Sequence, residues 1–119
     1  MNQSFENFES DAMTRIIAEN PNLSDKLTRQ YSSAKVVSRE FTGVGFFTDF
    51  EVMDKESKLD DCANLQLGNV QAKIKGIEFG AGFVLFIKDG FIKLLECYTY
   101  GEPLPAQIFE YSFEVDSPQ

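Results

Sequence analysis

The side chains best suited to chemistry follow Leu95, near the end of a predicted hairpin. Glu96, Tyr98, Tyr100 and Glu102 occupy every second position there. A carboxylate beside phenol hydroxyls can act as a general acid or base when its surroundings raise its pKa. Backbone donors of a turn can instead hold the same groups in place. We favour the structural interpretation, a hydrogen-bonded hairpin end, and keep an enzyme that uses Glu96 with Tyr98 or Tyr100 as an alternative.

Other catalytic and metal-binding groups are scarce. The chain has no histidine and two widely separated cysteines, Cys62 and Cys97. Ser-His and Cys-His nucleophile pairs are therefore excluded, as are zinc sites that need histidine or four cysteines. The acidic segment 49–61 lacks the alternating oxygen ligands and the turn glycine of a calcium loop. The sequence also lacks a Walker loop and a strand-to-helix GxGxxG motif, so we expect no cofactor, no metal and no catalytic residue.

Acidic residues suggest a different function. The net charge is −8, and all of the excess acid lies in segments 49–61 and 97–119. Asp49, Glu51, Glu110 and Glu114 fall on the outward-facing positions of two predicted strands. If those strands lie close together, the four carboxylates form one acidic patch that attracts a basic protein. The alternative is a set of unrelated solvated carboxylates.

Two helices and a sheet must position these groups. Apolar residues recur every three or four positions before Asn20-Pro21, which predicts an amphipathic helix facing the sheet; they are Phe5, Phe8, Ala12, Met13, Ile16 and Ile17. A second, short helix is predicted around Leu27. Alternating segments then predict strands near 36–42, 44–52, 70–75, 83–88, 91–96 and 108–115. We expect one α+β domain over residues 1–119, with two N-terminal helices packed on a mainly antiparallel sheet of about six strands.

The central hairpin decides where Glu96 points. Asp-Gly at 89–90 suits a two-residue type I′ turn, in which both central residues have positive φ. The register of such a hairpin pairs Leu85 with Leu94 and Phe83 with Glu96. It therefore predicts that Glu96 lies on the core face of the sheet.

Three strings, GVGFFTDFEV, GAGFVLFIKDG and LLECYTYGEPLP, resemble a family of small bacterial proteins of uncharacterised function. The resemblance covers residues 38–105, and the matching residues are Leu95, Glu96, Tyr98, Thr99, Tyr100, Gly101, Glu102 and Pro105. Cys97 stands where the family pattern has a small residue, and Leu104 where it has an aromatic one. The resemblance implies a bacterial origin and no established catalytic role.

Charge and hydropathy limit the partners and the cellular location that we expect. The acidic balance disfavours nucleic acid and anionic membranes as partners. No apolar run approaches the roughly 20 residues of a membrane span, and MNQSFENFES lacks the pattern of a signal peptide. We expect a cytoplasmic monomer or homodimer with free thiols. The leading hypothesis is a non-enzymatic protein-interaction module, in its sharpest form an immunity-like protein that neutralises a basic toxin domain; a small-molecule-binding module is the alternative beside the enzyme.

Overall fold

The computed structural model describes residues 3–60 and 63–115. Two helices precede six strands in the chain, and a short 3-10 turn follows the second strand. The elements are α1 (Gln3–Ala18), α2 (Ser24–Ser33), β1 (Ala34–Phe41), β2 (Gly45–Val52), η1 (Lys55–Ser57), β3 (Leu65–Ile74), β4 (Ala81–Lys88), β5 (Phe91–Thr99) and β6 (Tyr111–Val115). The predicted α+β class, with N-terminal helices, is confirmed.

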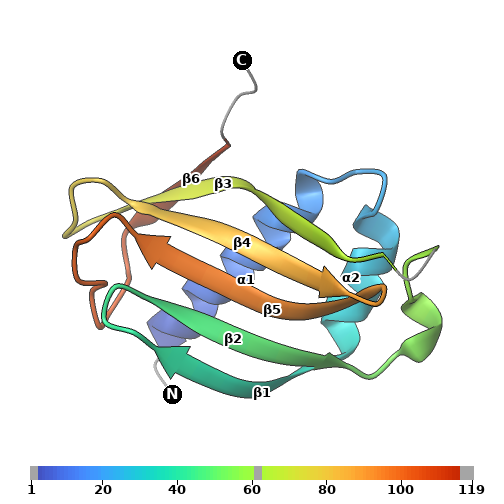
Figure 1. Cartoon of the computed structure of the whole chain (residues 1–119). Helices are drawn as coiled ribbons and strands as arrows, with labels where there is room; N and C mark the ends of the chain where they lie inside the picture. The colour runs from blue at the N-terminus through green and yellow to red at the C-terminus, as the bar shows by residue number, and fades with distance from the viewer. Residues whose placement is uncertain (1–2, 61–62, 116–119) are drawn as a thin grey trace.

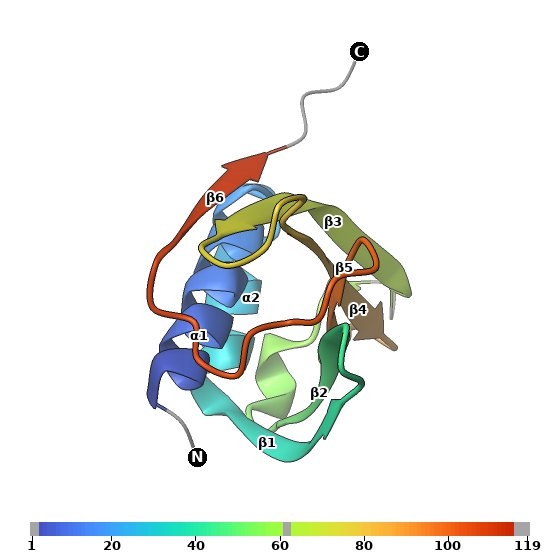
Figure 2. The ribbon, with the colours of Figure 1, turned by 90° about the vertical axis from the view of Figure 1, so that its left-hand side faces the viewer.

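All six strands form one antiparallel sheet in the order β1-β2-β5-β4-β3-β6 (Figure 1). The β4–β5 hairpin is thus inserted between β2 and β3, which are consecutive in the chain. The sheet curves, and both helices lie against its concave face (Figure 2). We call the opposite, convex face, which carries no helix, the outer face. No helix in residues 3–60 or 63–115 has the length and apolar character needed to cross a bilayer.

The apolar stripe of α1 fills the space between helix and sheet, as predicted. Its residues are at most 6% exposed: Phe5, Phe8, Ala12, Met13, Ile16 and Ile17. The ring of Phe8 packs 5.5 Å from that of Phe83 on β4, and the ring of Phe5 packs 4.7 Å from that of Phe46 on β2. Burial of such rings provides most of the driving force for docking a helix on a sheet.

The central hairpin begins as predicted and then changes register. Asp89 and Gly90 have φ of 52° and 87°, as a type I′ turn requires. Beyond the pairs next to the turn, β5 contains one extra residue relative to β4. Leu85 therefore faces Leu95, and Val84 faces Glu96. This β-bulge returns Leu95 to the core and turns the neighbouring carboxylate outward, which avoids burying a charge. The predicted core-face position of Glu96 is therefore wrong.

Candidate functional site

The four carboxylates predicted to form one patch lie near opposite edges of the sheet. Asp49 and Glu51 are on β2, Glu114 is on β6, and Glu110 immediately precedes β6. Strands β5, β4 and β3 lie between β2 and β6. At about 4.8 Å per strand this places the two pairs roughly 19 Å apart, well beyond the Debye length of about 8 Å at physiological ionic strength. The structure does not bring the four together, and the premise of a single acidic patch is wrong because the hairpin separates the strands.

Three of these carboxylates are also paired with lysines on neighbouring strands or segments. Nitrogen–oxygen distances are 2.8 Å for Asp49 with Lys93, 3.3 Å for Glu110 with Lys75, and 3.0 Å for Glu114 with Lys73. The pairs of Glu110 and Glu114 are exposed, and exposed pairs contribute little to stability, while Asp49 is half-buried. They do reduce the local negative field, so the excess charge acts over the whole molecule more than at these positions.

At the end of β5 and just after it, Tyr100 and Glu102 form structural hydrogen bonds, whereas the Glu96 carboxylate forms none among the described residues. The carboxylate of Glu102 accepts hydrogen bonds from the backbone N–H groups of Glu78 (2.8 and 3.1 Å) and Phe79 (2.9 Å). These bonds, that of Glu78 first, lower the pKa of Glu102. The hydroxyl of Tyr100 donates to Oε1 of Gln71 at 3.0 Å. Glu102 and Tyr100 thereby fasten the end of β5 to β3 and to the β3–β4 connection.

Tyr98 lies across the outer face with its ring against Gly82. Its register partners are Gly45 on β2 and Gly82 on β4. A Cβ atom added at Gly82 would come within 2.5 Å of the Tyr98 ring, so only glycine lets the ring lie against β4. Tyr100 packs edge-on against Tyr98, with ring centroids 5.8 Å apart. Gly82 therefore makes room for the aromatic ring, whereas the lack of a side chain at Gly45 lets β2 approach the Cys97 carbonyl of β5.

Glu96 stands in the middle of an apolar part of the outer face. It lies between Phe47 on β2 and Val84 on β4, while Leu94 and Tyr98 share its face on β5. We define the outer-face cluster by six half-buried residues of these three strands: Phe47, Val84, Phe86, Leu94, Glu96 and Tyr98. Within the part of the chain that the structure describes, the Glu96 carboxylate makes no hydrogen bond or ion pair.

A buried polar cluster joins α1 to β1 and β2. Glu9 is 4% exposed and accepts two hydrogen bonds from the Arg39 guanidinium, at 3.1 and 2.8 Å, and one from the Thr48 hydroxyl at 2.5 Å. The bond with Glu9 raises the pKa of Arg39, and the guanidinium also lies 5.4 Å from the centre of the Phe5 ring. Every charge here is paired, so the cluster orients α1 and is not a reactive site. Sequence reasoning missed it, although Glu9 sits four residues after Phe5, within the apolar stripe.

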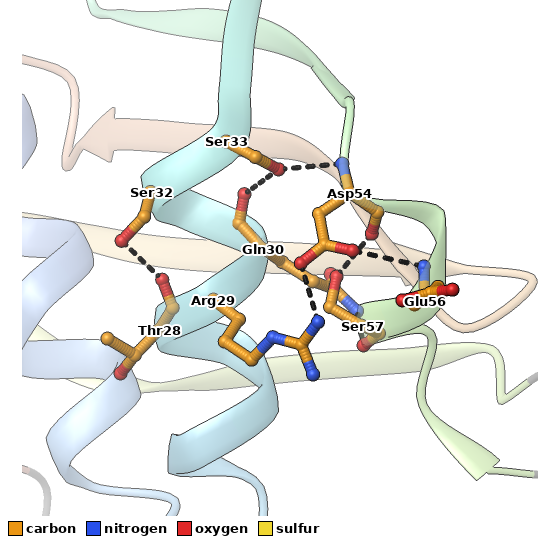
Figure 3. A network of polar contacts seen from close by, with 8 residues as sticks. All are labelled: Thr28, Arg29, Gln30, Ser32, Ser33, Asp54, Glu56 and Ser57. Atoms are coloured by element: carbon orange, nitrogen blue, oxygen red, sulfur yellow. Dashed lines mark hydrogen bonds and ion pairs between the residues drawn. The ribbon is translucent and has the colours of Figure 1, made fainter.

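A second buried network fixes the turn between β4 and β5. The fully buried amide of Gln30 donates to the carbonyl oxygens of Ser57 (2.9 Å) and Gly90 (2.8 Å) and accepts from the N–H of Ile92 (2.8 Å). Figure 3 shows the surrounding contacts between α2 and η1, among them the 2.8 Å ion pair of Arg29 with Asp54. These bonds satisfy the groups that the turn and η1 would otherwise leave unpaired, and they too are structural.

The nucleophile and metal candidates give no reactive centre. Cys97 is a buried free thiol, and burial, followed by the nearby charge of Glu96, raises its pKa to about 12. A thiol with that pKa is a poor nucleophile near neutral pH. Cys62 lies outside the described residues. Among residues 3–60 and 63–115, no three His, Cys, Asp or Glu side chains are grouped to hold a metal ion.

An apolar hollow of about 450 Å³ opens at the end of the sheet near the start of α1. Its lining comes from α1, the β1–β2 hairpin and the segment after β5: Phe5, Phe41, Gly43, Gly45, Leu104, Pro105 and Ala106. The N–H of Leu104 donates to the carbonyl of Gly43 at 2.9 Å and holds two of these walls together. The hollow has the size and apolar character of a small-molecule site.

No protein-family model matches the chain, and comparisons with curated proteins and with solved structures also found no match. The resemblance to a small bacterial family remains a prediction.

Proposed function

We propose that this protein is a non-enzymatic interaction module that binds another protein through the outer face of its sheet. The observation that carries this proposal is the outer-face cluster, because it occupies the three central strands on the side where no helix lies. In an antiparallel sheet with one face in water, the strands usually alternate apolar and polar residues, and the solvent-exposed face is polar. Here Phe47, Val84, Phe86 and Leu94 lie on that face.

The composition of the cluster supports a protein as the occupant. Contiguous apolar patches rimmed by polar residues are typical of interaction sites, and aromatic residues are enriched at the centres of such interfaces. Ion-paired and polar groups border the cluster, including Asp49 with Lys93 and the pair of Tyr100 with Gln71. The arrangement of an apolar centre and a polar rim therefore fits protein binding better than catalysis by Glu96 with Tyr98.

The charge of the chain favours a basic partner. A net charge of −8 attracts a basic domain over long range and accelerates association. An immunity-like role against a basic toxin domain is the specific form of the proposal. In that form the outer-face cluster supplies the contact area, and the dispersed carboxylates supply the attraction.

The proposal is tested by removing aromatic rings from the outer face in one variant and from connecting segments in a control variant. A photo-crosslinking residue at Phe47 captures the native partner, which is then purified for binding measurements. The double variant Phe47→Thr/Phe86→Thr keeps residues that favour strands and should weaken binding at least about 30-fold, the loss expected of a contact hot spot. The matched control Phe79→Thr/Phe109→Thr removes two rings that are 62% and 69% exposed in connecting segments.

The control should bind within about twofold of the wild type. Equal affinity of the outer-face variant and the wild type for the purified partner would exclude the outer face as the binding surface. For a toxin partner, co-expression of the wild type should restore growth of a strain that makes the toxin, and the Phe47/Phe86 variant should not.

A small-molecule-binding module is the second candidate, and the apolar hollow near Phe5 supports it. Leu104→Trp would fill the hollow with a larger side chain. If the hollow binds apolar ligands, this variant should lose the fluorescence enhancement of anilinonaphthalene sulfonate that the wild type produces. Unchanged enhancement would show that the dye binds elsewhere.

A further inference from the structure

We infer that the outer face selects a partner segment carrying a basic side chain, arginine best of all, and that Glu96 is the residue that binds it. This inference rests on the proposed function, since it names the chemistry of the partner at the same surface. It assigns Glu96 a role in recognition. The acid or base role considered from the sequence is not needed.

The Glu96 carboxylate is placed in the middle of the outer-face cluster. Glu96 lies on β5, the third strand of the sheet, with Phe47 opposite it on β2 and Val84 opposite it on β4. Directly opposed residues have Cβ atoms about 5 Å apart, so both apolar side chains contact the space around the carboxylate. Leu94 and Tyr98 enclose it along β5. A charge that served only solubility would be better placed at an edge of the sheet, where water reaches it from more directions.

The Glu96 carboxylate has no counterion among the described residues. The nearest lysine on the same strand, Lys93, is already paired with Asp49 at 2.8 Å. Among the described residues Glu96 has no hydrogen-bond or ion-pair partner of its own. In the free protein, water solvates the half-buried carboxylate. A partner that covers the cluster removes that water, and the carboxylate then needs a cation or strong donors in its place.

This requirement makes the face selective. A purely apolar partner would leave Glu96 buried and unpaired, which opposes binding. A second copy of this chain, laid face to face by a two-fold axis, would bring an acidic surface against an acidic surface. A basic side chain satisfies the carboxylate, and a guanidinium does so with two parallel hydrogen bonds.

The aromatic neighbours strengthen the preference for a cation. The rings of Phe47 and Tyr98 flank Glu96, and a guanidinium between them can stack on a ring face while it pairs with the carboxylate. Glu40 continues the same row on β1, opposite Phe47, and it too has no ion pair in the described residues. The backbones at Glu40 and Glu96 are two strand spacings apart, about 10 Å. A segment crossing the strands can thus present one basic side chain to each.

A direct test uses two peptides that differ only in charge, Ac-Thr-Val-Arg-Val-Thr-amide and its citrulline analogue, titrated into the isotope-labelled full chain. Amide chemical shifts report where each peptide binds and how tightly. The arginine peptide should shift amides of β2, β4 and β5 around Glu96, and the citrulline peptide should bind at least about 10-fold more weakly. Glu96→Gln should bind the arginine peptide at least about 10-fold more weakly than the wild type. Glu56→Gln, which removes the same charge in η1, should bind it like the wild type.

Three results would overturn the inference: equal affinities for the two peptides, an unchanged affinity of Glu96→Gln, or no shift on these strands at millimolar arginine peptide. Equal binding of both peptides to the outer face would leave the proposed function standing and remove only the role of Glu96. The proposed function fails by a different result, namely unchanged binding of the native partner to the Phe47/Phe86 variant. The glutamine variant keeps the shape of the side chain, and its own spectrum shows whether the fold is intact.

Discussion

Replacing Glu9 by leucine should destabilise the protein by about 3 kcal/mol, although leucine is apolar and favours helices. Three hydrogen bonds end on the Glu9 carboxylate, two from Arg39 and one from Thr48. Removing one member of a buried ion pair costs about 3–5 kcal/mol, because the other charge is left uncompensated. The lower end applies here, because the Arg39 side chain is 12% exposed and can turn its guanidinium toward water.

The measurement is urea unfolding of the wild type, Glu9→Leu, Arg39→Met and the double variant. The double variant should recover most of the loss, because replacing both charges by apolar groups leaves no unpaired ion. Glu19→Gln is the matched control, since Glu19 forms only the exposed pair with Arg15, and it should change stability by less than about 0.5 kcal/mol. A single variant within 0.5 kcal/mol of the wild type, or a double variant no better than the singles, would refute the reasoning.

Three further predictions concern a turn, a thiol and a carboxylate. Gly90→Ala should lower the melting temperature more than Gly43→Ala. Both positions have φ near 90°, but only at Gly90 would a Cβ meet the Leu59 carbonyl, at 2.9 Å. Equal losses of stability in the two variants would contradict this. Iodoacetamide at pH 8 should leave Cys97 unmodified in the folded chain and alkylate it in urea, as mass spectrometry of its peptide can show, because burial raises its pKa to about 12. The pKa of Glu102 is lowered on folding. The ionised carboxylate therefore stabilises the folded chain above its unfolded pKa, and this stabilisation is lost as the pH falls through the folded pKa. Glu102→Gln should flatten the acid limb of the profile of stability against pH.

Local periodicity was sufficient to predict the elements of the fold. The stripe from Phe5 to Ile17 repeats every three or four residues, and in the structure it faces the sheet. Alternation from Val44 to Val52 likewise predicted β2, whose even-numbered residues Phe46, Thr48, Phe50 and Val52 are buried. These signals depend only on neighbouring residues, which is why a single sequence contains them.

The register and the order of the strands could not be predicted in this way. Both faces of the β4–β5 hairpin carry apolar residues, so the pattern did not reveal the extra residue that turns Glu96 outward. A similar register shift interrupts β3 near Asn69, whose φ is 68°. For this reason the alternation of apolar and polar residues did not predict the first half of that strand. The insertion of the hairpin between β2 and β3 depends on contacts between residues far apart in the sequence, and together with β3 it separates Glu51 from Glu114.

The packing of Phe8 has a consequence for how the chain is made. This residue of α1 contacts Phe83 on β4 and also Tyr111 and Phe113 on β6, with ring centroids 5.0–5.9 Å apart. Translation proceeds at roughly 5–20 residues per second, so several seconds pass between the emergence of α1 from the ribosome and that of β6. Until β2 and β4 have emerged, the nascent helix has no sheet against which to dock, and Phe8 gains its contacts with Tyr111 and Phe113 last of all. The packing around Phe8 is therefore complete only after the last strand has been synthesised.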